Sequence, residues 1–145
     1  MPHDQVPDLV AIEHWLVTAR ITSLQHWDTL VFLFRHPTSL ASAEHIARLL
    51  GYATSEVVAA LEYLESLGFV TRSRASQGVR LYQFTAPAHT PPGDACHRLL
   101  RYADNRAVRL LLARKWRRGN RRPGTTNRLT SVSGREGGRP WRKVS

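Results

Sequence analysis

Apolar residues recur at helical spacing through the first third of the chain. In residues 8–19 they fall three or four positions apart, which predicts an amphipathic helix. Thr22-Ser23-Leu24-Gln25 then has the pattern of a capping box, in which Thr22 and Gln25 satisfy each other's backbone N–H groups at the start of a second helix. That helix is predicted to end at His36, because Pro37 disfavours helical geometry in the residue before it.

Two further helices follow with only a short turn between them. The spacing predicts a helix over residues 43–50, with Ser42 as its N-cap and Gly51 as its C-cap. A longer helix over residues 54–67 carries an apolar face of valines and leucines and ends at Gly68. The chain therefore places two helices end to end around a tight turn.

The pattern then changes from helical spacing to short runs of β-branched and aromatic residues. Residues 70–74 and 79–84 are predicted to be two strands joined by a loop at 75–78. After a proline-rich break, Thr90 and Pro91 are suited to start a fifth helix, predicted over residues 92–118. Its apolar stripe consists of Cys96, Leu99, Leu100, Ala103, Ala107, Leu110 and Leu111.

The order helix, turn, helix, hairpin is that of a winged helix-turn-helix, so the predicted fold class is mainly α with a small β-hairpin wing. The sequences of residues 43–52 and 55–70 resemble the MarR-like and ArsR-like transcriptional regulators, and the likeness extends over residues 22–84. We expect the chain to be organised in four parts: an N-terminal helix (1–21), a winged helix-turn-helix domain (22–86), a C-terminal helix suited to dimerisation (87–118) and a disordered basic tail (119–145).

The resemblance implies binding to double-stranded DNA, with the second helix of the motif in the major groove. The groove-facing positions carried over from the family are Thr54, Ser55, Glu56, Ala59, Glu62 and Tyr63. Family members often place Arg or Lys where this chain has Ala59 and Tyr63. No residue of this helix is an Arg, Lys, Asn or Gln that could make a bidentate purine contact, so direct reading of bases is in question.

Positive charge is concentrated in the last third of the chain, although the whole chain has a formal net charge of +10. Residues 1–90 hold six basic and eight acidic side chains, whereas residues 91–145 hold fifteen basic and three acidic ones. Such asymmetry is typical of an arm that contacts nucleic acid or another polyanion, and the alternative is a passive solubilising tail. The arm would consist of Arg114, Lys115, Arg117, Arg118, Arg121 and Arg122 around Trp116.

The wing supplies a second set of candidate phosphate contacts. Arg72, Arg74 and Arg80 flank the hairpin, and Gln77 lies near its tip. Strand alternation predicts that Arg72 and Arg74 share one face, within reach of consecutive phosphates or a narrow minor groove. The alternatives are an ordinary solvated hairpin and, for the arm, a helix end whose basic residues complement the helix dipole.

Other chemistry has little support in the sequence. The seven histidines are scattered, and the one cluster, Asp94 with Cys96 and His97, has poor geometry for a metal, so no metal site and no cofactor are predicted. The single cysteine, Cys96, is either a packed core residue or a redox sensor. No catalytic motif is present, and the chain is not expected to be an enzyme. We found neither a signal peptide nor a transmembrane stretch, which predicts a cytoplasmic protein without membrane contact.

These observations favour a DNA-binding transcriptional regulator acting as a homodimer through its flanking helices. A second hypothesis is a protein-interaction module of the same fold, in which Glu56, Glu62 and Tyr63 dock a partner. A third is a general chromosome-associated or RNA-associated protein, whose binding would depend wholly on residues 114–145.

Overall fold

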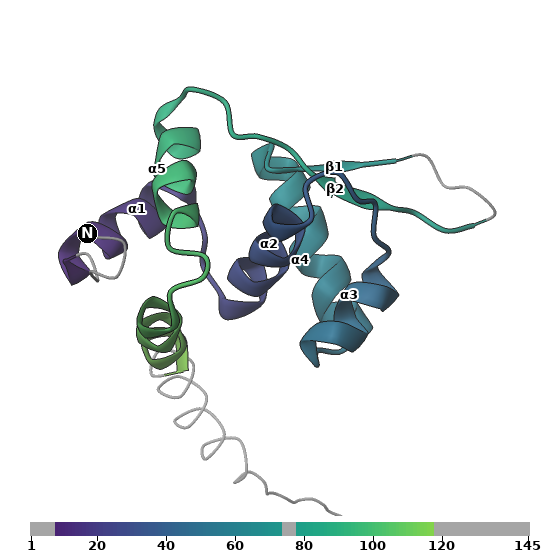
Figure 1. Cartoon of the computed structure of the whole chain (residues 1–145), viewed down its shortest axis with the longest axis horizontal. Coiled ribbons are helices and arrows are strands. Elements are labelled where there is room, and N and C mark those ends of the chain that lie inside the picture. Colours follow the sequence, from purple (N-terminus) through teal and green to yellow (C-terminus); the bar gives the residue numbers. More distant parts are fainter. Residues whose placement is uncertain (1–7, 74–77, 118–145) are drawn as a thin grey trace, which may run out of the picture. The chain divides into compact units, whose positions relative to one another are not determined.

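The computed structural model describes residues 8–73 and 78–117. The chain divides into two units, Met1–Arg109 and Leu110–Ser145, which are described separately. The first unit contains the elements labelled in Figure 1, listed here in chain order: α1 (Leu9–Ala19), α2 (Leu24–Arg35), α3 (Ala43–Leu50), α4 (Thr54–Leu67), β1 (Val70–Arg72), β2 (Tyr82–Phe84) and α5 (Pro91–Leu100). Residues 106–117 are also helical. The predicted fold class, a mainly helical winged helix-turn-helix, is confirmed.

The two helices of the motif have the predicted bounds because their ends are specified locally. The Ser42 hydroxyl accepts a hydrogen bond of 3.1 Å from the His45 amide and so caps α3. Gly51 ends α3 in the left-handed region, with φ at 83°, where a side chain would be strained. Ala53 precedes α4 without a polar side chain, and Glu56 Oε1 instead accepts a bond of 3.0 Å from the Ala53 amide.

The start of α2 differs from the prediction by one residue. Ser23 is the N-cap, and its hydroxyl accepts a hydrogen bond of 3.1 Å from the His26 amide. The expected capping box of Thr22 with Gln25 is therefore wrong. Thr22 lies outside the helix, with its hydroxyl 3.3 Å from His26 Nδ1. The helix ends at Arg35, as the following His36-Pro37 predicts.

The wing is an antiparallel pair in which Val70, Thr71 and Arg72 face Phe84, Gln83 and Tyr82. The bounds of both strands are shorter than predicted, although the Ser73 amide still donates a hydrogen bond of 2.8 Å to the Leu81 carbonyl past Arg72. Beyond it the Ser73 hydroxyl accepts a bond of 3.1 Å from the Leu81 amide, so a side chain replaces a ladder contact. Ala41 bridges to Tyr82 on the other edge, through two backbone bonds of 3.0 and 2.8 Å.

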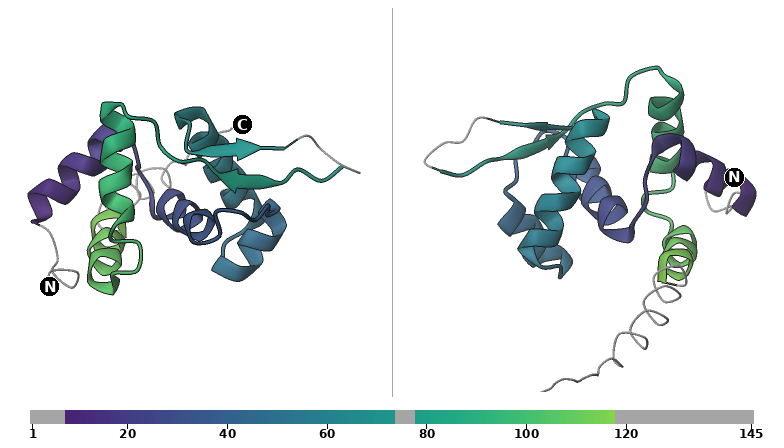
Figure 2. Two further views of the ribbon diagram at one scale, coloured as in Figure 1. Left: turned by 45° about the horizontal axis from the view of Figure 1, so that its top comes forward. Right: turned by 180° about the vertical axis from the view of Figure 1, so that it is seen from behind.

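The hydrophobic core of the motif forms where α2 and α3 pack against α4. Trp27 and Leu30 of α2, Ile46 of α3 and Leu61 and Leu64 of α4 are at most 2% exposed. Figure 2 shows the hairpin extending outward from the end of α4. The packed core thus fixes α4 on one face and leaves its opposite face open to solvent.

The predicted long C-terminal helix is broken, which corrects the sequence-based expectation for residues 92–118. Helix α5 ends at Leu100, residues 101–104 form turns, and a new helix begins at residue 106. Asn105 caps that helix, since its Oδ1 accepts a 3.1 Å bond from the Val108 amide. Arg35 of α2 stabilises the turn: its guanidinium donates a hydrogen bond of 3.2 Å to the Ala103 carbonyl and forms an ion pair of 2.6 Å with Asp104.

The break also changes which apolar residues are buried. Cys96, Leu99 and Leu100 of the predicted stripe are buried on α5, which packs against α1. Beyond the break the phase of the pattern shifts, so Leu110 is 54% exposed while Val108 and Leu112 are buried. The single stripe expected along one helix is therefore two faces on two shorter helices.

Candidate nucleic-acid interface

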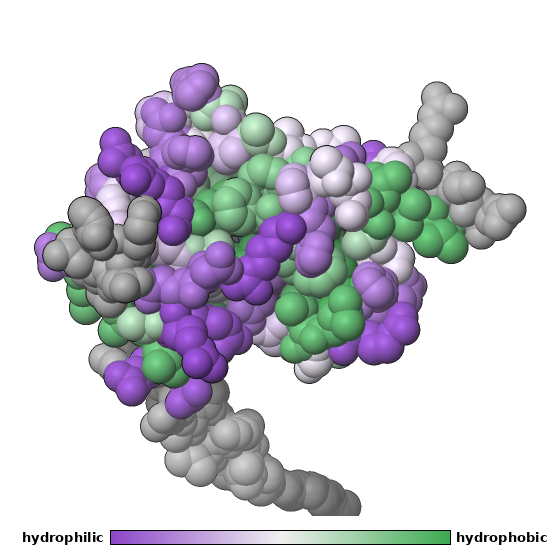
Figure 3. All heavy atoms as spheres, viewed as in Figure 1, coloured by the Kyte–Doolittle hydropathy of each residue, from purple (hydrophilic) through white to green (hydrophobic). Residues whose placement is uncertain are grey.

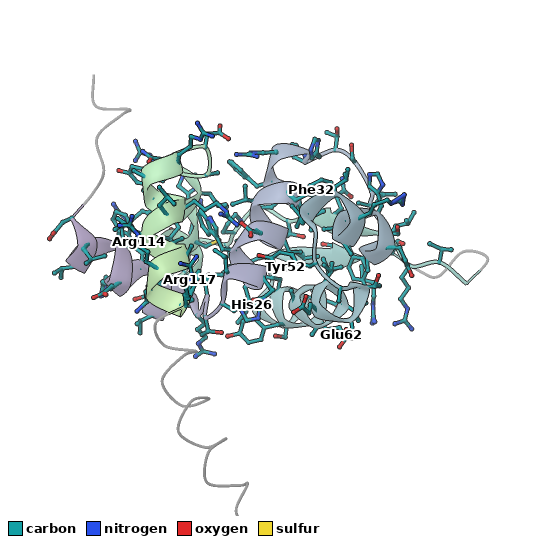
Figure 4. The ribbon with its side chains drawn as sticks, turned by 90° about the horizontal axis from the view of Figure 1, so that it is seen from below. His26, Phe32, Tyr52, Glu62, Arg114 and Arg117 are labelled. Carbon is teal, nitrogen blue, oxygen red and sulfur yellow. The ribbon has the colours of Figure 1, made fainter. Side chains whose placement is uncertain are left out.

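The exposed face of α4 carries three small side chains and one glutamate. Ser55, Ala59, Glu62 and Ser66 are exposed and recur at a spacing of three or four residues, so they share one side of the helix. The opposite side is buried in the core described above. Figure 4 shows Glu62 at the outer side of this helix. Thr54 is also exposed, at the first position of α4.

Two of the residues predicted to face the groove have other partners. The Glu56 carboxylate accepts a hydrogen bond from the Ala53 amide and so caps the start of α4. The Tyr63 hydroxyl donates a bond of 2.6 Å to the Arg20 carbonyl, and its ring stacks on His26 with centroids 4.3 Å apart. Burial lowers the pKa of His26. Tyr63 thus ties α4 to the junction of α1 and α2, whereas Thr54, Ser55 and Ala59 remain open.

The arginines of the wing lie in different surroundings. Arg72 on β1 pairs with Glu65 of α4 at 3.6 Å, and both side chains are about one-third exposed. Arg80 is exposed and lines a groove of about 410 Å³ between the motif and the wing, together with Glu44 and Glu62. Arg74 and Gln77 lie outside the described residues. The expectation that Arg72 and Arg74 share a face therefore stays a prediction.

The basic segment is partly described. Arg114, Lys115 and Arg117 are exposed on the helical residues 106–117, and Figure 4 labels the two arginines. Their spacing of three residues places these arginines on neighbouring turns of one helix. Arg118, Arg121 and Arg122 lie outside the described residues.

A partly buried polar cluster connects the turn of the motif to two other parts of the unit. The Asp28 carboxylate accepts a 2.6 Å bond from the Tyr52 hydroxyl and two bonds from Arg109, of 2.9 Å from Nε and 2.8 Å from Nη2. Only 12% of the Asp28 side chain is exposed. Burial and the bond to Asp28 raise the pKa of Tyr52, so its phenol remains a proton donor. Sequence reasoning missed this cluster, and a lone acid on the largely apolar α2 was the one available signal.

A second feature that the sequence analysis missed is an apolar groove of about 290 Å³ beside α3. Phe32 lies between His36 and His45, with ring centroids 4.8 and 6.4 Å away. Leu40 and Leu49 line the same groove and are 52% and 58% exposed. Figure 3 shows apolar surface in the region of α3.

The surroundings of Cys96 do not favour metal binding or redox sensing, the two roles other than core packing that its sequence position allows. The thiol is buried on α5, and burial raises its pKa to about 12. A thiol of this kind is a poor nucleophile and a poor metal ligand. Within residues 8–73 and 78–117, no three His, Cys, Asp or Glu side chains are grouped to hold a metal ion. In the same ranges, no helix is long and apolar enough to cross a membrane.

The chain is similar to known proteins both in sequence and in structure. Residues 22–80 match the sequence model of the MarR family. Among solved structures, the S. aureus MepR–DNA complex is similar with a TM-score of 0.50 and 17% identity, covering 86% of this chain and 90% of that one. A MarR-family transcriptional regulator from Silicibacter pomeroyi is similar with a TM-score of 0.47 and 16% identity, covering 88% and 83%. No curated protein matches the chain.

Proposed function

We propose that this chain is a transcriptional regulator that binds double-stranded DNA through α4 and the wing, because its winged helix-turn-helix matches the MarR family model over residues 22–80. The observation that carries the proposal is the family match over residues 22–80, together with an α4 whose one face is packed and whose other face is open. An exposed second helix beside a projecting hairpin has the dimensions for the major groove with the wing at the adjoining backbone. Regulation of chromosomal genes would place the chain in the cytoplasm.

Base reading by α4 would rely on short side chains. Thr54 and Ser55 carry hydroxyls that hydrogen-bond several base edges, and Ala59 offers a methyl group to a thymine methyl. Because Ala59 and Ser55 are small, the helix backbone can approach the bases closely. Glu56 is held in the cap of α4, which leaves its carboxylate less available to accept a hydrogen bond from a cytosine amino group.

Contacts to phosphates would come from outside α4. Arg80 is exposed beside the wing, and Arg72 is held by an exposed ion pair weak enough for a phosphate to replace Glu65. The basic residues Arg114, Lys115 and Arg117 would track the backbone and release counterions. The proposal also includes, because of their positions in the sequence, five residues outside the described ranges: Arg74, Gln77, Arg118, Arg121 and Arg122.

A homodimer would give the regulator two copies of α4. On α1, Val10 and Val17 are 70% and 77% exposed and lie seven residues apart, so they share the side of the helix that α5 leaves uncovered. Pairing of such faces across a two-fold axis would set two recognition helices about one turn of DNA apart. Sedimentation analysis of the full-length protein and of a Val10→Glu/Val17→Glu variant tests this part of the proposal.

The DNA-binding proposal is tested by fluorescence anisotropy across a salt series. The duplexes are the upstream region of the protein's own gene and a scrambled sequence of equal length and composition. One variant replaces Arg114, Lys115 and Arg117 by Gln, and a matched control replaces the exposed Arg98, Arg101 and Arg106 by Gln. We expect preference for the upstream duplex in all three proteins and a shallower salt dependence in the first variant alone. Equal affinity for both duplexes in the unmodified protein would contradict sequence reading.

A second candidate function is docking of a protein partner on the same face. The observation that favours it is the charge of this face, where Glu62 projects from α4 and Glu44 lies in the same groove. Carboxylates at these positions repel phosphates and would attract a basic peptide. This candidate predicts that replacing Glu62 weakens the interaction with the partner, whereas the DNA-binding proposal predicts stronger binding to DNA.

A further inference from the structure

We propose that Asp28, Tyr52 and Arg109 position α4 for DNA, so that the start of α4 responds to whether Arg109 holds the Asp28 carboxylate. This inference rests on the proposed DNA-binding function. The three side chains come from α2, from the turn between α3 and α4, and from the helical segment that follows Asn105. Their separations of 24 and 81 residues in sequence make the cluster a tertiary connection. It connects the helix-turn-helix to a segment outside it.

Tyr52 is placed where it controls the entry of the chain into α4. It stands between Gly51, which ends α3 in the left-handed conformation, and Ala53, the N-cap of α4. The Tyr52 amide donates to the Ala47 carbonyl at 3.1 Å, so its backbone is held by α3. Its hydroxyl donates a hydrogen bond of 2.6 Å to the carboxylate of Asp28 on α2. Tyr52 is thus held through both its backbone and its side chain, one position before the N-cap, and so sets the direction in which α4 begins.

Arg109 determines whether Asp28 can hold Tyr52. The guanidinium makes a two-point contact with a carboxylate that is only 12% exposed. An ionised carboxylate with so little exposure is destabilising when it has no charged partner. Without Arg109, the Asp28 side chain would therefore turn toward solvent. The same movement would take the acceptor away from the Tyr52 hydroxyl. A displacement of the segment around Arg109 would therefore be transmitted to the first turn of α4.

The chain contains a matched pair that lacks this connection. Arg35 of α2 pairs with Asp104 at 2.6 Å and so also joins α2 to the segment after α5. That pair is exposed, with side-chain exposures of 51% and 85%, and Arg35 bonds to Ala103 and Asp104 instead of to Asp28 or Tyr52. Loss of Arg35 thus removes an exposed ion pair to the segment after α5 and leaves the hydrogen bonds of Asp28 to Tyr52 and Arg109 intact.

The test measures amide hydrogen exchange in the free full-length protein and DNA affinity in parallel. The variants are Tyr52→Phe and Arg109→Gln, with Arg35→Gln as the matched control. The informative amides are those of Glu56 and Val57, which donate to the Ala53 carbonyl in the first turn of α4. The Leu30 and Ile46 amides report the stability of the core. The DNA probe is the upstream duplex already described.

We expect faster exchange at Glu56 and Val57 in both test variants, with no change at Leu30 and Ile46, and an affinity loss of about tenfold. Arg35→Gln loosens the turn at 101–104 but leaves the bonds of Asp28 to Tyr52 and Arg109 in place, so it should change exchange at Glu56 and Val57, and affinity, less than Arg109→Gln does. Exchange at Glu56 and Val57 that stays at the rate of the unmodified protein would overturn the proposal, and so would an equal increase at all four amides. If exchange changes as expected but the unmodified protein does not bind DNA, the proposed function fails and the positioning of α4 stands.

Discussion

The hydroxyl of Tyr63 donates a hydrogen bond of 2.6 Å to the backbone carbonyl of Arg20, which is in the left-handed conformation with φ at 67°. A non-glycine residue at positive φ is strained, and it persists where its surroundings hold it. Tyr63 supplies such a constraint from the middle of α4, and its ring stacks on His26 on the same side. The residue therefore joins α4 to the end of α1.

Replacement of Tyr63 by Phe tests whether this role is structural. The ring and its stacking remain while the bond to Arg20 is lost, so we expect the free energy of unfolding to fall by about 1 kcal/mol. Chemical denaturation measures that loss. Affinity for DNA, corrected for the folded fraction, should be unchanged. A selective loss of affinity without loss of stability would instead assign the hydroxyl to DNA contact.

The histidine beneath this ring predicts how stability depends on pH. Burial lowers the pKa of His26 below its ordinary 6.5, so below that pH the unfolded chain binds a proton that the folded chain does not. The folded state is then disfavoured, and the free energy of unfolding falls as the pH drops from 6.5 toward the folded-state pKa. Denaturation of the protein and of His26→Gln at several pH values measures this term.

A control variant separates His26 from the other histidines. His97 is exposed on α5, and His97→Gln should retain the pH dependence of the unmodified protein. The difference in unfolding free energy between neutral and mildly acidic pH should be smaller in His26→Gln. An equal difference in all three proteins would show that another group causes the acid sensitivity.

The buried thiol of Cys96 predicts chemical inertness. Because its pKa is raised to about 12, the thiolate that reacts with electrophiles is scarce, and the side chain is closed to reagents. We expect iodoacetamide to modify Cys96 far more slowly in the native protein than in urea, as followed by mass spectrometry. Rapid modification of the native protein would return the redox-sensor hypothesis to consideration.

Local sequence signals were sufficient for the central part of the fold. The bounds of α3 and α4 were predictable because Ser42, Gly51 and Gly68 specify the ends of these helices through contacts within a few residues. The break after α5 was not predictable in this way, since Arg35 stabilises the turn at 101–104 from far away in sequence. Apolar periodicity alone continued the helix across Asn105.

The candidate site shows the same division. Exposure of Ser55, Ala59 and Glu62 follows from helical periodicity, so the open face of α4 was predictable. The engagement of Tyr63 by Arg20 and the cluster around Asp28 depend on side chains brought together by tertiary packing. A pattern along one helix contains no information about such partners.

Glu62 provides the sharpest distinction between the two candidate functions. Its carboxylate lies on the open face of α4, where a phosphate backbone would approach it. Removing this charge by Glu62→Gln should strengthen binding to duplex DNA about threefold, because one repulsive interaction near the surface is worth less than 1 kcal/mol. Anisotropy at low salt, where screening is weakest, measures the effect.

The control for this prediction removes the same charge elsewhere. Asp94→Asn on α5 changes the net charge equally at another exposed position, so any general effect of charge appears in both variants. A gain in affinity confined to Glu62→Gln supports α4 as the helix that approaches DNA, because only a charge close to the phosphates acts over the screened distance. Equal gains in the two variants, or none, would mean that α4 does not face the duplex, and the docking of a basic partner at Glu44 and Glu62 would then be the better account of this surface.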